Sequence, residues 1–201
     1  MSSIPQLMGG RALEHGIALA VDHGGFSSSK MYVGGQAAVQ TAASSAFTNS
    51  TDETAISTMT IPANSLVAGS TIRVRAAGIA TATNGTDELT VQLKLDTTAT
   101  AIGSAESVVS TGAVDVANND IYDINAMIVV RSVGSSGTAI AIGSVHLNAE
   151  ADARSQDLKA QFTIDTTVEN TLQITADWSA ANAGNSMRSD IFVVDIVNPA
   201  T

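Results

Sequence analysis

The sequence contains no cysteine, and it is poor in aromatic and charged residues. Without cysteine there is no disulfide, no thiol chemistry and no cysteine-based zinc site, so stability must come from packing, to which oligomerisation would add. Charged residues make up 14% of the chain, against roughly 25% in average globular proteins. Alanine, threonine and serine replace them. Such a neutral, hydroxyl-rich surface favours a protein that lies against other proteins; a low-charge secreted domain is the equally compatible alternative.

Basic residues are particularly scarce. Nine lysines and arginines oppose 19 acidic residues, which gives a formal net charge of −10. This balance argues against binding to nucleic acid or to anionic membranes, because both need clustered positive charge. The first residues lack the basic and long apolar regions of a signal peptide, and the apolar run 17–21 is too short to span a bilayer. We therefore expect no nucleic-acid partner, no membrane partner and no export by a cleaved signal.

Two regions differ in composition. In residues 1–50, glycine pairs interrupt short apolar pieces, which disfavours both helices and long strands. We expect an extended N-terminal arm here, packed along its own domain or along a neighbouring subunit. From residue 51 onward, runs with period-two hydrophobicity alternate with turn signals. We expect residues 51–201 to form one all-β domain.

The expected fold is a jelly-roll-like antiparallel β-sandwich of eight to ten strands. In the strand at 121–133, the side chains of Tyr122, Ile124, Ala126, Ile128 and Val130 share one face. Gly143 is expected to mark a bulge, and the apolar run 191–194 suggests a strand covered on both faces. The strands are expected at 54–61, 71–77, 89–95, 99–102, 106–110, 121–133, 138–147, 158–166, 171–178 and 187–197.

The stretch 171–186 is the most informative part of the chain because it carries the only tryptophan, Trp178. Alternate residues 172, 174, 176 and 178 are apolar and predict a core face, while 171, 173, 175 and 177 are polar. Small residues follow, and their lack of bulk would let another segment approach closely. We expect this stretch to serve folding and not catalysis.

No motif predicts a catalytic, cofactor-binding or metal-binding residue. The histidines His15, His23 and His146 share no metal-ligand spacing, and no nucleophile elbow is present. The pairs Asp87-Glu88 and Asp120/Asp123 suit turn capping better than glycosidase chemistry. The other weak candidates are a calcium loop at Asn118-Asn119-Asp120 with Asp123, and a glycine-rich segment at 24–30 that lacks the phosphate-loop spacing.

Four arginines fall on expected strands: Arg73, Arg75, Arg131 and Arg188. In a chain with so few basic residues, they would pair with acids across a sheet or across an interface. The simpler alternative, an exposed sheet face, is favoured for any single arginine.

Several segments together carry a family resemblance. PANSLVAGSTIRVRAAG, TNGTDELTVQLKL, NDIYDINAMIVVRSVG and NTLQITADWSAANAGNS with a final apolar strand resemble β-sandwich structural proteins of tailed bacteriophages. The resemblance covers about residues 51–197 and not the arm. It implies a virion protein made in the bacterial cytoplasm, either a capsid decoration protein or a tail-fibre module.

The resemblance implies, as the first expectation, a decoration (cement) protein that binds the outside of the major capsid protein lattice. The arm would contact the lattice, and the sandwich would self-associate as a homotrimer. The alternative is a tail-tip or fibre module whose end loops, such as 80–87, bind host glycan. A carbohydrate-active jelly-roll enzyme is a third possibility, and we expect no enzymatic activity because paired acids and clustered histidines are lacking.

Overall fold

The computed structural model describes residues 35–96, 102–148 and 153–199. These residues form two antiparallel sheets and a single 3-10 turn at Ile102–Ser104. The strands are β1 (Gly35–Val39), β2 (Phe47–Thr48), β3 (Thr54–Ile61), β4 (Leu66–Thr81), β5 (Glu88–Asp96), β6 (Glu106–Ser110), β7 (Val114–Asp115), β8 (Asp120–Ser132), β9 (Gly137–Leu147), β10 (Ala153–Ile164), β11 (Asn170–Trp178) and β12 (Ser186–Pro199).

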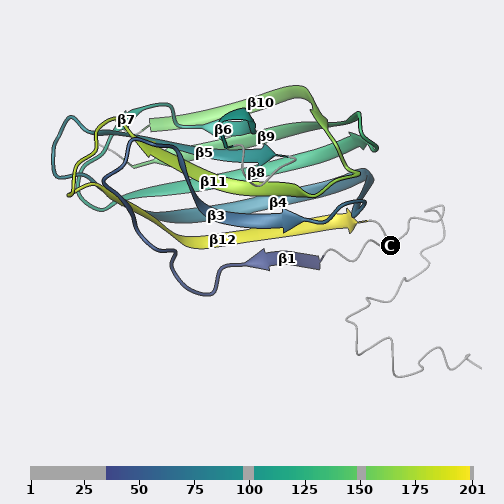
Figure 1. Ribbon diagram of the computed structural model, residues 1–201, viewed down its shortest axis with the longest axis horizontal. Coiled ribbons are helices and arrows are strands. Elements are labelled where there is room, and N and C mark those ends of the chain that lie inside the picture. The colour runs from purple at the N-terminus through teal and green to yellow at the C-terminus, as the bar shows by residue number, and fades with distance from the viewer. Residues whose placement is uncertain (1–34, 97–101, 149–152, 200–201) are drawn as a thin grey trace, which may run out of the picture.

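The larger sheet has seven strands in the order β1-β12-β4-β8-β9-β10, with β2 also paired to β12. The smaller sheet has the order β3-β11-β5-β6, with β7 beside β5. The strands run along the long axis of the molecule, and the connections gather at its two ends (Figure 1). The fold is therefore an all-β antiparallel sandwich, as expected; the jelly-roll connectivity within that class stays a prediction.

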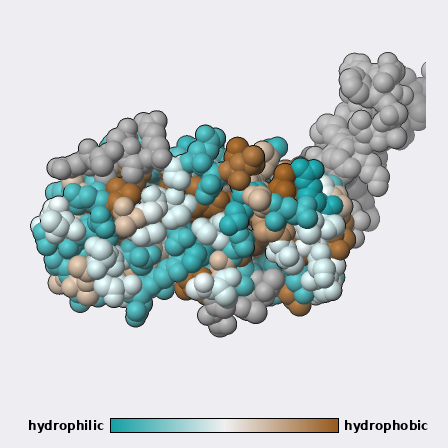
Figure 2. All heavy atoms as spheres, turned by 90° about the horizontal axis from the view of Figure 1, so that it is seen from above, coloured by the Kyte–Doolittle hydropathy of each residue, from teal (hydrophilic) through white to brown (hydrophobic). Residues whose placement is uncertain are grey.

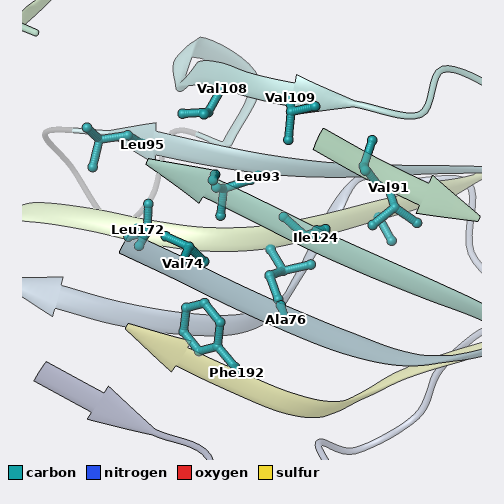
Figure 3. Close-up of a cluster of buried hydrophobic side chains, with 14 of the residues drawn as sticks. Val74, Ala76, Val91, Leu93, Leu95, Val108, Val109, Ile124, Leu172 and Phe192 are labelled. Atoms are coloured by element: carbon teal, nitrogen blue, oxygen red, sulfur yellow. The ribbon is translucent and has the colours of Figure 1, made fainter. Parts of the chain in front are cut away.

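The core fills the space between the two sheets. The alternation in β8 is confirmed, because Tyr122, Ile124, Ala126, Ile128 and Val130 are all buried. Figure 3 shows side chains of both sheets meeting in this layer. The labelled side chains are Val74, Ala76, Val91, Leu93, Leu95, Val108, Val109, Ile124, Leu172 and Phe192.

Trp178 lies in this core, with 1% of its surface exposed. Its strand β11 is the centre of the smaller sheet, between β3 and β5. The expected apolar face is confirmed, but the polar face of β11 is also buried, since Thr171, Gln173 and Thr175 are each at most 4% exposed. Both faces of β11 are therefore largely buried.

Two sequence predictions about the larger sheet are wrong. Gly143 does not mark a bulge, since its register with Ala126 and Asp157 is regular. A Cβ at this position would lie 2.8 Å from the Cβ of Val109 in the facing sheet, so glycine is needed for close packing between sheets. The run 191–194 is not covered on both faces either. Ile191 is 48% exposed, and the shift between Ser189 and Ile191 interrupts the register of β12 with β4.

Part of the expected arm belongs to the larger sheet. Within residues 35–50, β1 and β2 both pair with β12. Gln40 fixes this segment further, because its Nε2 donates to the carbonyl of Ser189 at 2.6 Å. Residues 1–34 lie outside the described residues, so an arm over 1–50 and a domain over 51–201 stay predictions. The expected strand at 99–102 also falls mostly outside the described residues.

Candidate interaction surface

The outer face of the seven-stranded sheet collects the arginines. Strand register places Arg73 beside Met127, and Arg75 beside Asn125. Arg131 continues the outward row of β8, and Arg188 lies opposite Ile79 at the end of β4. All four arginines whose side chains the structure describes are therefore exposed on one surface, which we call the arginine face. The alternation of each strand predicts an outward arginine, but only the sheet order brings the four together.

The arginines divide into two paired and two unpaired side chains. Arg75 contacts Asp123 at 2.8 Å across β4 and β8, and Arg188 contacts Asp190 at 2.9 Å. Arg73 and Arg131 have no ion pair with any described residue. Exposed ion pairs contribute little to stability, about 0–1 kcal/mol each. The two ion pairs of the arginine face therefore contribute little to folding. The guanidinium groups of Arg73 and Arg131 are exposed and free to make other contacts.

An apolar row crosses the same face. Met127, Ile142 and Leu158 are cross-strand neighbours on β8, β9 and β10, next to Arg73 on β4. They are 39%, 39% and 75% exposed. Beside the row lies an open depression of about 220 Å³, lined by Met127 and Ile142 and by the polar side chains of Asn125 and Ser144. Methionine and arginine are enriched at protein interfaces, whereas lysine is depleted, and this face combines the first two.

The charge of the arginine face differs from that of the rest of the described surface. The face carries four arginines and the aspartates Asp123, Asp190 and Asp195. The other described side chains carry twelve acids and only two lysines, Lys94 and Lys159. The net charge of −10 is thus distributed unevenly. The arginine face is nearly neutral, and the rest of the described surface is acidic.

The outer face of the smaller sheet is built differently, around a buried ion pair. Lys94 Nζ contacts Glu53 at 2.6 Å, and only 8% of the lysine side chain is exposed. Glu53 also accepts hydrogen bonds from Thr175 Oγ1 at 2.6 Å and from Gln92 Nε2 at 3.4 Å. These bonds tie the segment before β3 to β5 and β11. Sequence reasoning missed this cluster because Glu53 is 122 positions away from Thr175.

Asp177 lies at the edge of this cluster. Burial raises the pKa of its carboxyl above the ordinary value, and the negative charge of Glu53 raises it further. A hydrogen bond from Thr90 and the positive charge of Lys94 act in the opposite direction. The cluster contains acids and a base, but its hydrogen bonds are directed at one another and it has the form of a structural network.

The other sequence candidates are not brought together into a site. His15, His23 and the glycine-rich segment 24–30 lie outside the described residues, and His146 lies on β9 next to Asp123 of β8. Asp120 accepts the N–H of Ala117 at 2.7 Å and caps the turn before β8. Among the described residues, no group of three or more metal-ligating side chains occurs. The expectations of no catalytic, cofactor or metal site stay predictions.

The loops 82–87 and 179–185 form a tightly packed end of the sandwich. Asp87, which is buried, accepts hydrogen bonds from the side-chain amides of Asn182 and Asn185 at 3.2 and 3.0 Å. A Cβ on Gly184 would lie 2.1 Å from Thr83 Oγ1, so the close approach expected for this small-residue loop is confirmed. The carboxylate of Asp87 thus caps neighbouring loops.

Aromatic side chains are absent from the described surface. Phe47, Tyr122, Phe162, Trp178 and Phe192 are the aromatic residues that the structure describes, and each is buried. Figure 2 views the sandwich from the side on which Figure 1 shows β10, where separate brown apolar patches lie among teal and white residues. These exposed apolar groups are therefore aliphatic, a character that suits contact with protein better than stacking on sugar rings.

The comparisons with known proteins give no family to which the chain belongs. No family model matches the sequence, and no curated protein matches it. Within the described part of the chain, no helix is long and apolar enough to cross a membrane.

Proposed function

We propose that the protein is a virion structural protein, a capsid decoration (cement) protein that binds the outside of the major capsid lattice. The observation that carries this proposal is the arginine face, an exposed sheet surface with an apolar row and two unpaired guanidinium groups. A protein that works by binding other proteins needs an exposed surface of this kind, with apolar and charged side chains together. The sequence resemblance to phage β-sandwich proteins supplies the setting, the phage head.

The architecture supports a stabilising role. The seven-stranded sheet offers a broad surface, and the described end loops are held together by side-chain hydrogen bonds. Rigid surfaces bind with a smaller entropic penalty than mobile ones. Many copies on one lattice also strengthen attachment through multivalency, so modest affinity at each site suffices. A homotrimer built on the sandwich, with residues 1–50 toward the lattice, is the assembly that we propose.

Copy number tests this proposal. Quantitative mass spectrometry of purified particles that carry the chain should give hundreds of copies per particle, as expected for a protein that covers a head lattice. A handful of copies would refute a decoration role and favour the tail. A particle reconstruction should then place the sandwich density on the outer surface of the head.

The alternative role as a tail-fibre or tail-tip receptor-binding module receives less support. Sugar binding commonly uses an exposed aromatic platform, and the described aromatic residues are all buried. The loop 82–87 remains the relevant test site. Binding of the oligomer to a glycan array, abolished by substitutions in this loop, would favour the alternative role.

A further inference from the structure

The turn between β10 and β11 carries acidic residues and an exposed apolar side chain, a combination that complements the arginines and the apolar row of the arginine face. It contains Asp165, Val168 and Glu169, and Val168 is 40% exposed. Val168 lies in the connection between two strands, and the acidic residue Glu169 follows it directly. No other exposed large apolar residue that the structure describes combines these two features. We call residues 165–170 the acidic turn.

The acidic turn is held in one conformation. The carboxylate of Asp165 accepts from the backbone N–H of Thr167 at 2.9 Å and from its hydroxyl at 2.6 Å. Asn170 is 1% exposed, and its side-chain amide donates to the carbonyls of Asp165 and Val168 at 2.8 and 3.1 Å. These bonds are local and do not involve the carboxylate of Glu169. The isopropyl group of Val168 and the Glu169 carboxylate therefore project from a preorganised turn, which lowers the entropic cost of binding.

We propose that the acidic turn of one copy docks on the arginine face of a second copy of this chain. The side chain of Val168 enters the depression beside Met127 and Ile142, and Glu169 pairs with Arg73. The depression has a volume of about 220 Å³, which is ample for a valine side chain. Arg73 lies one strand spacing from Met127, about 4.8 Å, so a residue next to the docked valine reaches it.

Charge distribution favours docking of the acidic turn on the arginine face of a second copy over docking of two arginine faces against each other. Two of the three aspartates on the face, Asp123 and Asp190, already pair with arginines of the same face. Two identical faces would therefore bring together four unpaired guanidinium groups with few acids to meet them. The acidic turn instead supplies carboxylates, and complementary potentials set both the partner and the register of an interface.

This contact joins two different surfaces of the chain and is heterologous. A heterologous contact repeats until it closes into a ring or continues as a filament. Ring closure at three copies would give the homotrimer of the proposed function, and the inference rests on that function for its place on a particle. The contact itself is a property of the isolated full chain and is measured without particles.

Two single variants and their mixture test the contact. Met127→Asp damages the face and Val168→Asp damages the turn, and both side chains are exposed, so the fold should be retained in circular dichroism. In sedimentation velocity at about 100 µM, each variant should be a monomer, with the dissociation constant raised roughly 30-fold or more. An equimolar mixture retains one intact face and one intact turn, and should form dimers and nothing larger. Ile121→Asp, an exposed residue of the same sheet outside the depression, is the matched control and should assemble normally.

Each contrary outcome overturns the inference. A wild-type chain that is monomeric at this concentration refutes it, and so does a Val168→Asp variant that assembles like the wild type. Particle binding is a separate readout. A monomeric chain present at high copy number on heads refutes the contact and leaves the proposed function intact. An assembling chain found only at a phage tail refutes the function and leaves the contact intact.

Discussion

Replacing Trp178 by phenylalanine should cost the protein far less stability than replacing it by alanine. The indole is buried, and its Nε1–H has no hydrogen-bond partner among the described residues. A buried donor without a partner costs about 1–3 kcal/mol. The native protein therefore carries a penalty at this position that an aromatic hydrocarbon ring would remove.

The two effects of the phenylalanine substitution can be compared. Phenylalanine is about 40 Å³ smaller than tryptophan, and the lost transfer free energy of the removed ring atoms together with ~24 cal/mol per Å³ of cavity costs about 1–2 kcal/mol. Removing the unpaired donor returns about 1–3 kcal/mol. The stability of Trp178→Phe should thus lie between about 1 kcal/mol below and about 2 kcal/mol above that of the native protein. Trp178→Ala should lose about 3–5 kcal/mol, because most of the ring volume is left empty.

Urea unfolding followed by far-ultraviolet circular dichroism measures both variants, since tryptophan fluorescence is lost with the residue itself. The slope of the free energy against urea should be unchanged, which shows that the same surface is exposed on unfolding. A loss of more than about 2 kcal/mol in Trp178→Phe would show that the indole N–H makes a stabilising hydrogen bond. A near-neutral Trp178→Ala would refute burial of the ring.

Three further substitutions test the packing and the polar cluster. Glu53→Ala should destabilise the protein by about 3–5 kcal/mol in urea unfolding, because it leaves the buried ammonium group of Lys94 without its counter-ion. Asp177→Asn should raise stability at pH 7. The folded-state pKa of this carboxyl is raised, so the ionised aspartate destabilises the folded state at neutral pH. The penalty shrinks as the pH falls below the folded-state pKa and is gone below the unfolded-state pKa. Gly143→Ala should cost about 1–3 kcal/mol through overpacking against Val109, and Gly143→Ala with Val109→Ala should lose less than the sum of the two single changes.

Controls make these outcomes interpretable. Gly85→Ala adds a methyl group where nothing lies within 4 Å, and should change stability by less than about 0.5 kcal/mol. A double change of Glu53→Gln and Lys94→Met should be less damaging than Glu53→Ala, since it removes both charges. If Asp177→Asn is equally stabilising at pH 7 and at pH 3, the raised pKa is not the cause.

The strands were largely predictable because their hydrophobic alternation is local. The expected limits of β3 and β6 agree with the structure, and those of β5 and β8 differ by one residue at each end. β4 is longer than predicted and passes through Gly69 with a φ of 91°. Pairing with β12 and β8 on its two sides extends it, and such neighbours are distant in sequence.

The features that depend on sheet order were not predictable. Alternation shows that Arg73 and Arg131 point outward, but it does not place them on one sheet. Thr175 of β11 donates a hydrogen bond to Glu53, which lies 122 positions away in the chain, and hydrophobic alternation carries no information about a contact of that kind. Glycine in a strand is explained either by a bulge or by the close approach of another segment, and for Gly143 only the facing Val109 decides between the two.

The position of β4 has a consequence for synthesis of the chain. β4 lies between β8 and β12, and β12 follows all the other described strands in the chain. During translation, one edge of β4 therefore has no partner, and open edges of this kind invite pairing between nascent chains. Arg73 and Arg75 alternate with apolar residues on this strand, and charged residues on a waiting edge discourage such pairing. These two arginines would then protect the nascent protein before they take part in any mature interface.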